Sequence, residues 1–344
     1  MSALTIVGLD NVLSSIPAML TFVPTESIVF LPLVSEPGGG QTLGPVARVD
    51  LTVVTAMPDT VARQLARVFS VLPVASLIAA VITTVDEPAD DLPCRSEVAA
   101  ISKALSENGL PEPEALFVPS MTAGTLWRCY LHPCHIGVLP DPATTALAAS
   151  TVVAGESIKA SRDDLARRFT PSPDSDRGRL RPLVAAAASA VAVEDGADDR
   201  RVLRGRIASM DRAVSDVDKG RYPDRDAVIA ELIAAFGTPV LRDAMLITRT
   251  REATVALEDL ALYLWKLTEE PYASHLAAVV AASAYRRGDG AGAATAVDAA
   301  TESCVLAQLI SAVLQRGLRP SKVDELFGQA AQTVRADLGI PNQL

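Results

Sequence analysis

The sequence predicts an α/β unit with a mixed sheet flanked by helices, followed by an all-α helical unit, in a chain of 344 residues. Up to residue 170, apolar runs of strand length alternate with segments of helical period, which is typical of a sheet flanked by helices. From residue 181 onward every segment has helical period. Residues 171–180 are rich in Pro, Ser, Asp and Gly, a composition typical of linkers. We therefore expect an α/β domain at 1–170, a linker at 171–180 and a helical domain at 181–344.

The α/β unit is organised around residues 22–50, which have the pattern of a turn, a strand, a loop and a second strand. Apolar side chains fill positions 28–34 almost without interruption, as in a strand that is covered on both faces. Pro32 lies inside this run and has no amide hydrogen, so its N–H side must face an edge or a bulge. A glycine loop at 38–40 and a second apolar run follow. Two strands joined in this way are most simply an antiparallel pair.

The other elements before residue 170 follow from local signals. Asp10 is the predicted N-cap of a helix that runs to Leu20, and Pro58 with Asp59 is typical of a helix start. Ser161 and Asp164 have the spacing of a capping box. The remaining predicted elements are strands at 4–7, 75–85, 114–120 and within 122–131, and helices at 96–108 and 142–153.

Segments of helical period follow one another through the second half of the chain. The clearest, at 303–315, places Leu306, Leu309 and Ile310 on one stripe that we expect to face the core. Small and apolar residues between Val280 and Ala300 have the spacing of a tetratricopeptide hairpin, although only one copy is visible and an ordinary helix pair is the alternative. The predicted helices are 180–193, 200–217, 224–236, 239–248, 252–267, 272–287, 291–300, 303–315 and 321–338.

Composition and charge narrow the functional classes. The formal net charge is −10 and aromatic residues make up 4% of the chain, so groups that neutralise phosphates or stack on bases are scarce. Acidic residues flank the arginine cluster at 200–206, which we therefore interpret as a solvated helix face. The longest apolar run, 71–85, contains Pro73 and is too short to span a bilayer, and the amino terminus lacks a basic signal segment. We expect a cytoplasmic protein that binds neither nucleic acid nor membrane.

Four residues near position 130 have the side-chain types of a zinc site: Cys129, His132, Cys134 and His135. Adjacent Cys134 and His135 cannot easily reach one ion in tetrahedral geometry, and structural zinc sites usually draw on two separated pairs. A full site would use three of the four or borrow a distant group such as Cys94. We therefore predict no metal and no cofactor, with zinc kept as the weaker alternative.

The motifs of common enzyme classes do not assemble a catalytic set. No Gly-Lys-Ser/Thr follows the glycines at 38–40, and no nucleophile elbow surrounds Ser27. Arg48 with Asp50, and Arg162 with Asp163, are candidate residues for a polar binding site at strand ends, with structural ion pairs as the alternative. No catalytic residue is predicted.

Several spaced blocks of sequence resemble one known family. The blocks are "IPAMLTFVPTESIVFLPL" followed by "ARVDL", "LWRCYL" leading to "AGESIKASRDDLARRF", "LRDAML", "LYLWKL" and "AASAYRRGDGAGAATAVDAA". Together they are similar to the actinobacterial family called domain of unknown function 4192, over nearly the whole chain. The resemblance implies a cytoplasmic actinobacterial protein and carries no established activity. It also shows a departure, because His132 and His135 stand where cysteines are usual in that family.

Two functional hypotheses follow from these patterns. The first is a non-catalytic protein whose helical half binds a protein partner or self-assembles, with exposed Arg286 and Arg287 contacting the partner. The alternative is an enzyme or ligand-binding protein that uses a small-molecule pocket in the α/β domain. A large apolar groove between helices would favour the first, and a convergent polar pocket at strand ends would favour the second.

Overall fold

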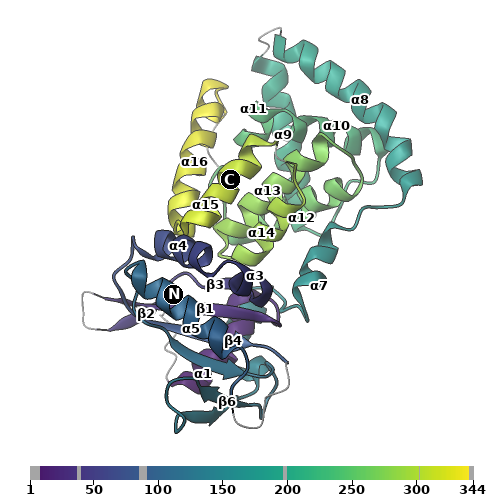
Figure 1. Cartoon of the computed structure of the whole chain (residues 1–344). Helices are drawn as coiled ribbons and strands as arrows, with labels where there is room; N and C mark the ends of the chain where they lie inside the picture. The colour runs from purple at the N-terminus through teal and green to yellow at the C-terminus, as the bar shows by residue number, and fades with distance from the viewer. Residues whose placement is uncertain (1–7, 37–39, 85–90, 197–199, 302, 341–344) are drawn as a thin grey trace. The chain divides into compact units, whose positions relative to one another are not determined.

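A computed structural model describes residues 8–36, 40–84, 91–196, 200–301 and 303–340 of the chain (Figure 1). The chain divides into two compact units, the first comprising Met1–Leu165 with Gln315–Gly317, and the second Ala166–Leu314 with Leu318–Leu344. The first unit contains the strands and several helices, and the second is helical, so the predicted fold class is confirmed. A linker at 171–180 stays a prediction. Among the described residues, no helix combines the length and the apolar character that crossing a bilayer requires.

The described residues of the first unit form a seven-stranded mixed sheet that curls into a half-barrel. Its strand order is β2-β1-β4-β5-β6-β7, with β3 also paired to β1. The β4–β5 pair is parallel and the other pairs are antiparallel, including the predicted pair around residues 22–50. The strands are β1 (Ser27–Ser35), β2 (Gln41–Leu43), β3 (Ala47–Asp50), β4 (Val74–Ile82), β5 (Glu114–Val118), β6 (Leu126–Cys129) and β7 (Ile136–Val138).

Pro32 lies in the middle of the sheet, and the neighbouring strand is interrupted opposite it. The carbonyl of Pro32 accepts a hydrogen bond from the Gly44 amide at 2.8 Å, and Gly44 lies in the break between β2 and β3. In a strand, the N–H and C=O of one residue serve the same neighbour. The missing donor of Pro32 therefore falls at this break between two short strands, in keeping with the prediction that its N–H side faces an edge or a bulge.

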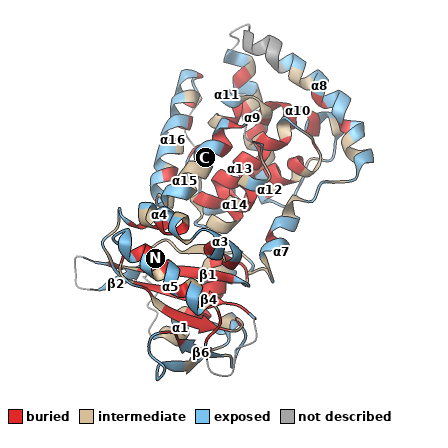
Figure 2. Cartoon of the chain, viewed as in Figure 1, coloured by how far each residue is buried: buried red, intermediate tan, exposed pale blue. Residues whose placement is uncertain are grey.

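Strand β1 is buried on both faces, as its sequence indicates (Figure 2). Ile28 and Phe30 belong to a core that also contains side chains of α3 (Leu51–Ala56), α4 (Pro58–Phe69) and α5 (Arg95–Glu107). Val29 and Leu31 point to the opposite face because side chains alternate along a strand, and they too are fully buried. The other helices of this unit are α1 (Leu9–Ser14), α2 (Ile16–Leu20), α6 (Ala146–Val153) and α7 (Arg162–Ala166).

Of the two predicted caps at helix starts, the one at Ser161 is confirmed and the one at Asp10 is wrong. Ser161 and Asp164 form the predicted capping box, since the Asp164 amide donates to the Ser161 hydroxyl at 3.0 Å. Asp10 does not cap the first helix, which begins at Leu9; its carboxylate instead accepts a hydrogen bond from the indole of Trp127 at 2.5 Å. The predicted strand at 4–7, glycines 38 and 39 and the end of the predicted strand at 75–85 lie outside the described residues.

The second unit contains a helix in every segment where the sequence predicts one. Helix α13 is almost wholly buried and packs against α10, α12, α14 and α16. Helix α8 begins at Asp174, several residues before the predicted start. The tetratricopeptide likeness stays a prediction. The helices are α8 (Asp174–Gly196), α9 (Arg200–Asp218), α10 (Asp226–Gly237), α11 (Pro239–Ala244), α12 (Arg251–Lys266), α13 (Tyr272–Arg286), α14 (Gly290–Asp298), α15 (Val305–Arg316) and α16 (Pro320–Asp337).

The apolar stripe of α15 is narrower than the sequence predicts. Leu306 and Ile310 are buried, as expected. Leu309 is 52% exposed, so its predicted place in the core is wrong. Leu306 and Ile310 lie one turn apart on the same side of the helix, whereas Leu309 is rotated away from Ile310 by about 100°. Only the side that carries Leu306 and Ile310 meets the core.

Candidate functional site

Charged and polar side chains gather at one edge of the sheet, where β3 and β4 end and β1 begins. Ser27, the first residue of β1, pairs with Asp50 of β3 on one side and with Ile82 of β4 on the other. We call the group formed by Glu26, Ser27, Arg48, Asp50 and Arg162 the strand-end cluster. Carboxyl ends of strands are common places for ligand sites in α/β sheets.

The Asp50 carboxylate lies between two guanidinium groups of this cluster. Arg48 Nη2 is 2.7 Å from Asp50 Oδ1, and Arg162 Nη1 is 3.9 Å from Asp50 Oδ2. Arg48 also donates to the carbonyl of Thr25 at 3.3 Å. The sequence paired Arg48 with Asp50 and Arg162 with Asp163. The structure brings Arg48, Asp50 and Arg162 into one group. Asp163 is instead exposed in the first turn of α7.

Two buried polar atoms of the strand-end cluster lack a hydrogen-bond partner among the described residues. They are the hydroxyl of Ser27 and Nε of Arg48. A buried polar group without a partner costs about 1–3 kcal/mol. The Arg48 guanidinium also lies over the ring of Phe22, 5.9 Å from its centroid, a weaker contact that does not replace a hydrogen bond. This edge therefore retains capacity to bind a polar group.

Glu26 is a residue of this cluster that the sequence indicated only as part of a turn. It has φ of 42°, in the left-handed region that non-glycine residues rarely adopt. Its carboxylate accepts hydrogen bonds from the Thr83 hydroxyl at 2.8 Å and the Thr84 amide at 2.9 Å. Partial burial raises the pKa of Glu26, but the hydrogen bonds from Thr84 and Thr83 outweigh burial, and the pKa lies below its ordinary value. Glu26 thus ties the start of β1 to the end of β4.

The structure rearranges the predicted Cys/His cluster. Cys129 and His135 come together with Glu114, a residue outside the predicted set, and the ligand atoms of these three all lie within 4.8 Å of one another. Cys134 is exposed and outside this group. The ring of His132 lies beside that of His135, with 5.1 Å between the centroids. No local sequence pattern links Glu114 to Cys129 and His135, because only the pairing of β5 with β6 brings Glu114 near them.

Arg286 and Arg287 are not exposed, which corrects the sequence prediction. The side chain of Arg286 is 4% exposed, forms an ion pair with Asp324 and donates to the carbonyls of Leu246 and Ile247 at 3.1 Å. The side chain of Arg287 is 8% exposed and pairs with Glu258, whose side chain is 2% exposed. Both arginines thus reach inward to oxygen atoms of neighbouring helices or of the segment that follows α11. A role of these two arginines in binding a partner stays a prediction. The exposure from which that role was inferred is not present.

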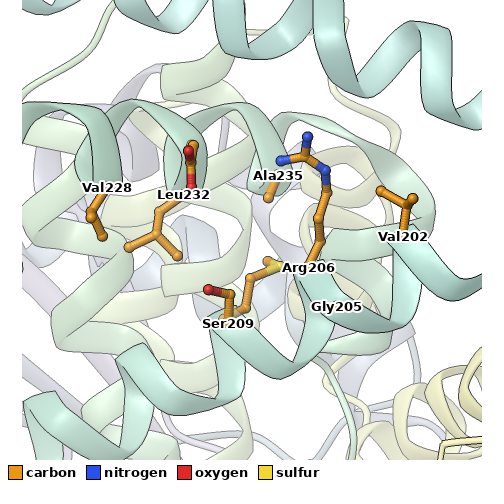
Figure 3. A pocket seen from close by; sticks show the side chains of 9 residues that line it. Val202, Gly205, Arg206, Ser209, Val228, Leu232 and Ala235 are labelled. Carbon is orange, nitrogen blue, oxygen red and sulfur yellow. The ribbon is translucent and has the colours of Figure 1, made fainter.

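A pocket of about 310 Å³ opens between α9 and α10 of the helical unit (Figure 3). We call it the α9–α10 pocket. Its buried apolar lining comes from Met210, Leu232 and Ala235, and its more exposed lining includes Arg206 and Glu231. The sequence periodicity predicts both helices, but it does not indicate that their facing sides leave a pocket. Its other lining residues are Val202, Gly205, Ser209 and Val228.

A family model described as a domain of unknown function (DUF4192) matches residues 10–321. No curated protein and no solved structure matches the chain.

Proposed function

We propose that this chain, which belongs to the DUF4192 family of domains of unknown function, uses its helical unit to bind a segment of a partner protein in the α9–α10 pocket. The observation that supports this proposal is the pocket itself, with its apolar floor and its charged rim. Such a surface suits recognition of an apolar anchor presented by a helical segment.

The floor of the pocket determines the apolar part of the partner. Met210, Leu232 and Ala235 offer no charged group, and the thioether of Met210 adapts to differently shaped side chains. The volume of about 310 Å³ is at the lower end of typical ligand pockets, about 300–1,000 Å³. The pocket therefore suits one or two large apolar side chains, such as Leu or Phe, better than a cofactor.

Charge around the pocket determines the polar part of the partner. The amino-terminal half of α9 carries Arg200, Arg201, Arg204 and Arg206, and Arg206 lines the pocket itself. Positive charge on this half of the helix steers an acidic segment toward the site and sets its register more than its affinity. Glu231 lies on the α10 side of the pocket, so the two rims differ in charge and favour one orientation. The occupant is therefore an apolar anchor flanked by Asp or Glu.

Gly205 allows a sharp test of this function. It lies inside α9, lines the pocket, and a Cβ added there would meet nothing within 4 Å. Gly205→Leu should fill the pocket without destabilising the fold, because glycine inside a helix costs about 0.5–1 kcal/mol relative to alanine. Gly178→Leu is the matched control, since Gly178 is also exposed within a helix and has open space around it.

The measurement is a selection of displayed helical peptides on the full-length protein. We expect the enriched peptides to carry an apolar anchor beside acidic residues, and to lose binding to Gly205→Leu while keeping it to Gly178→Leu. Enriched peptides that bind both variants equally would refute the proposed site. Dimerisation of the wild type in sedimentation experiments, abolished by Gly205→Leu alone, would instead assign the pocket to a second copy of the chain.

A further inference from the structure

We infer that Glu114, Cys129 and His135 form a binding site for a divalent transition-metal ion of the zinc class, on one face of strands β5, β6 and β7. This inference concerns the α/β unit and is independent of the proposed peptide site. Its ligand set differs from the one that the sequence indicates, because the fold contributes Glu114 and uses only one of the adjacent residues Cys134 and His135.

The strand register places the three ligands on the same face. Cys129 pairs with Leu116 of β5, so the residue two positions before Leu116, Glu114, lies diagonally across from Cys129 on that face. In the next pair of strands, Arg128 is opposite Ile136, and Cys129 is therefore opposite His135. The Cys129 amide donates to the His135 carbonyl at 3.0 Å, which confirms this pairing.

The distances between the ligand atoms are close to those of a metal site. All three lie within 4.8 Å of one another, and His135 Nδ1 is 3.9 Å from Glu114 Oε1. Bonds of about 2.0–2.3 Å to a tetrahedral ion place ligand atoms roughly 3.5 Å apart. Cys129 is buried and held in the sheet, whereas Glu114 and His135 are partly exposed. Small rotations of these two side chains are therefore enough to close the site around an ion.

The donor atoms select the kind of ion. A thiolate, an imidazole and a carboxylate are all ligands of Zn²⁺, and the thiolate disfavours Mg²⁺ and Ca²⁺, which prefer oxygen. Binding requires that the thiol of Cys129 release its proton. Three protein ligands leave one position of a tetrahedral ion for solvent. The bound ion would tie the turn that carries His135 to β5, and this should raise the melting temperature by mass action.

Cobalt spectroscopy of the full-length protein, stripped with a chelator, tests this site. We expect about one Co²⁺ per chain, with the intense visible bands of tetrahedral coordination and a thiolate-to-cobalt charge-transfer band. Cys129→Ser should abolish the charge-transfer band. Cys134→Ser is the matched control and should leave it unchanged, because Cys134 lies outside the ligand set.

Competition with a chromophoric chelator gives the Zn²⁺ affinity of each variant. Loss of an outer hydrogen-bond partner of a ligand alone costs 10–100-fold in affinity, so removal of a ligand by His135→Ala or Glu114→Gln should weaken Zn²⁺ binding at least about tenfold. Both change partly exposed side chains, so they keep the test valid if Cys129→Ser disturbs folding. His132→Ala should retain most of the binding.

Three results would overturn the assignment: a folded wild-type protein without the charge-transfer band, loss of that band in Cys134→Ser, or equal loss of affinity in His132→Ala and His135→Ala. None of these results bears on the α9–α10 pocket, because the variants used there lie in the other unit.

Discussion

At the scale of single residues, buried carboxylates determine which arginine side chains of the helical unit point inward. Arg286 and Arg287 precede a Gly-Asp-Gly turn, a context that is typical of exposed side chains. Glu258 nevertheless lies in the interior of the unit, where it accepts from Arg287 and from Arg168, the latter at 2.6 Å. A buried carboxylate without partners would be costly. Arg287 and Arg168 therefore satisfy a carboxylate that the fold has already buried.

Reversing one of these charges should be severely destabilising. Arg287→Glu would place a second carboxylate beside Glu258, and breaking a buried pair costs about 3–5 kcal/mol. Arg212→Glu is the control, because Arg212 is exposed on α9 and surface changes usually stay within about 0.5 kcal/mol. Urea denaturation followed by circular dichroism measures both variants. Equal stability of the two variants would show that the buried pair does not form.

At the scale of elements, packing against distant segments decides whether a short segment pairs as a strand and which side of a helix is buried. Strand β7 was not predicted, because Ile136 and Val138 point to solvent and only three residues pair. Gly137 between them lies against Trp127, where an added Cβ would come within 2.6 Å of the indole. The same hairpin then carries the indole to its hydrogen bond with Asp10. No local pattern in the sequence indicates these contacts.

The corrected face of α15 leads to a prediction at this scale. Ile310 is 1% exposed, so Ile310→Asp would bury an unpaired charge at a cost of several kcal/mol and should unfold the helical unit. Leu309→Asp should change stability by less than about 0.5 kcal/mol, because Leu309 is on the surface. Thermal denaturation followed by helical ellipticity compares the two. A larger loss of stability for Leu309→Asp would show that the helix is rotated from the described orientation.

At the scale of the whole molecule, the chain folds as two units whose cores differ in construction. The first buries β1 between side chains on both faces of a sheet, and the second surrounds α13 with helices. Between Thr170 and Pro173 the backbone is in neither helix nor strand, and α8 begins immediately afterwards. The segment that the sequence predicts as a linker is therefore part helix and part irregular backbone.

Limited proteolysis should cut this irregular segment first. Thr170, Pro171 and Pro173 are exposed, whereas residues from 174 onward have helical hydrogen bonds that oppose cleavage. A broad-specificity protease at low ratio, with fragments identified by mass spectrometry, should cut at or beside residues 170–173 before it cuts elsewhere in the described part of the helical unit. A first cut within α15 would contradict the predicted boundary.

The sequence by itself determined the fold class, a helix in each predicted segment of the second unit and the antiparallel start of the sheet. It also identified members of the strand-end cluster, Arg48, Asp50 and Arg162, and two members of the metal-type cluster, Cys129 and His135. The fold prediction succeeded because hydrophobic period and turn chemistry act between residues close in the chain, whereas a binding role for these side chains stays a prediction.

The tertiary structure alone decided which of those residues meet, and on which face. It placed Glu114 beside Cys129 through a strand pairing, buried Arg287 against Glu258 and left Leu309 exposed. It also opened the α9–α10 pocket between two helices whose individual patterns predict only that each has a buried side. The physical reason is the same in each case. Periodicity specifies that a face is buried, whereas packing between distant segments decides what covers it and which polar groups must then find partners.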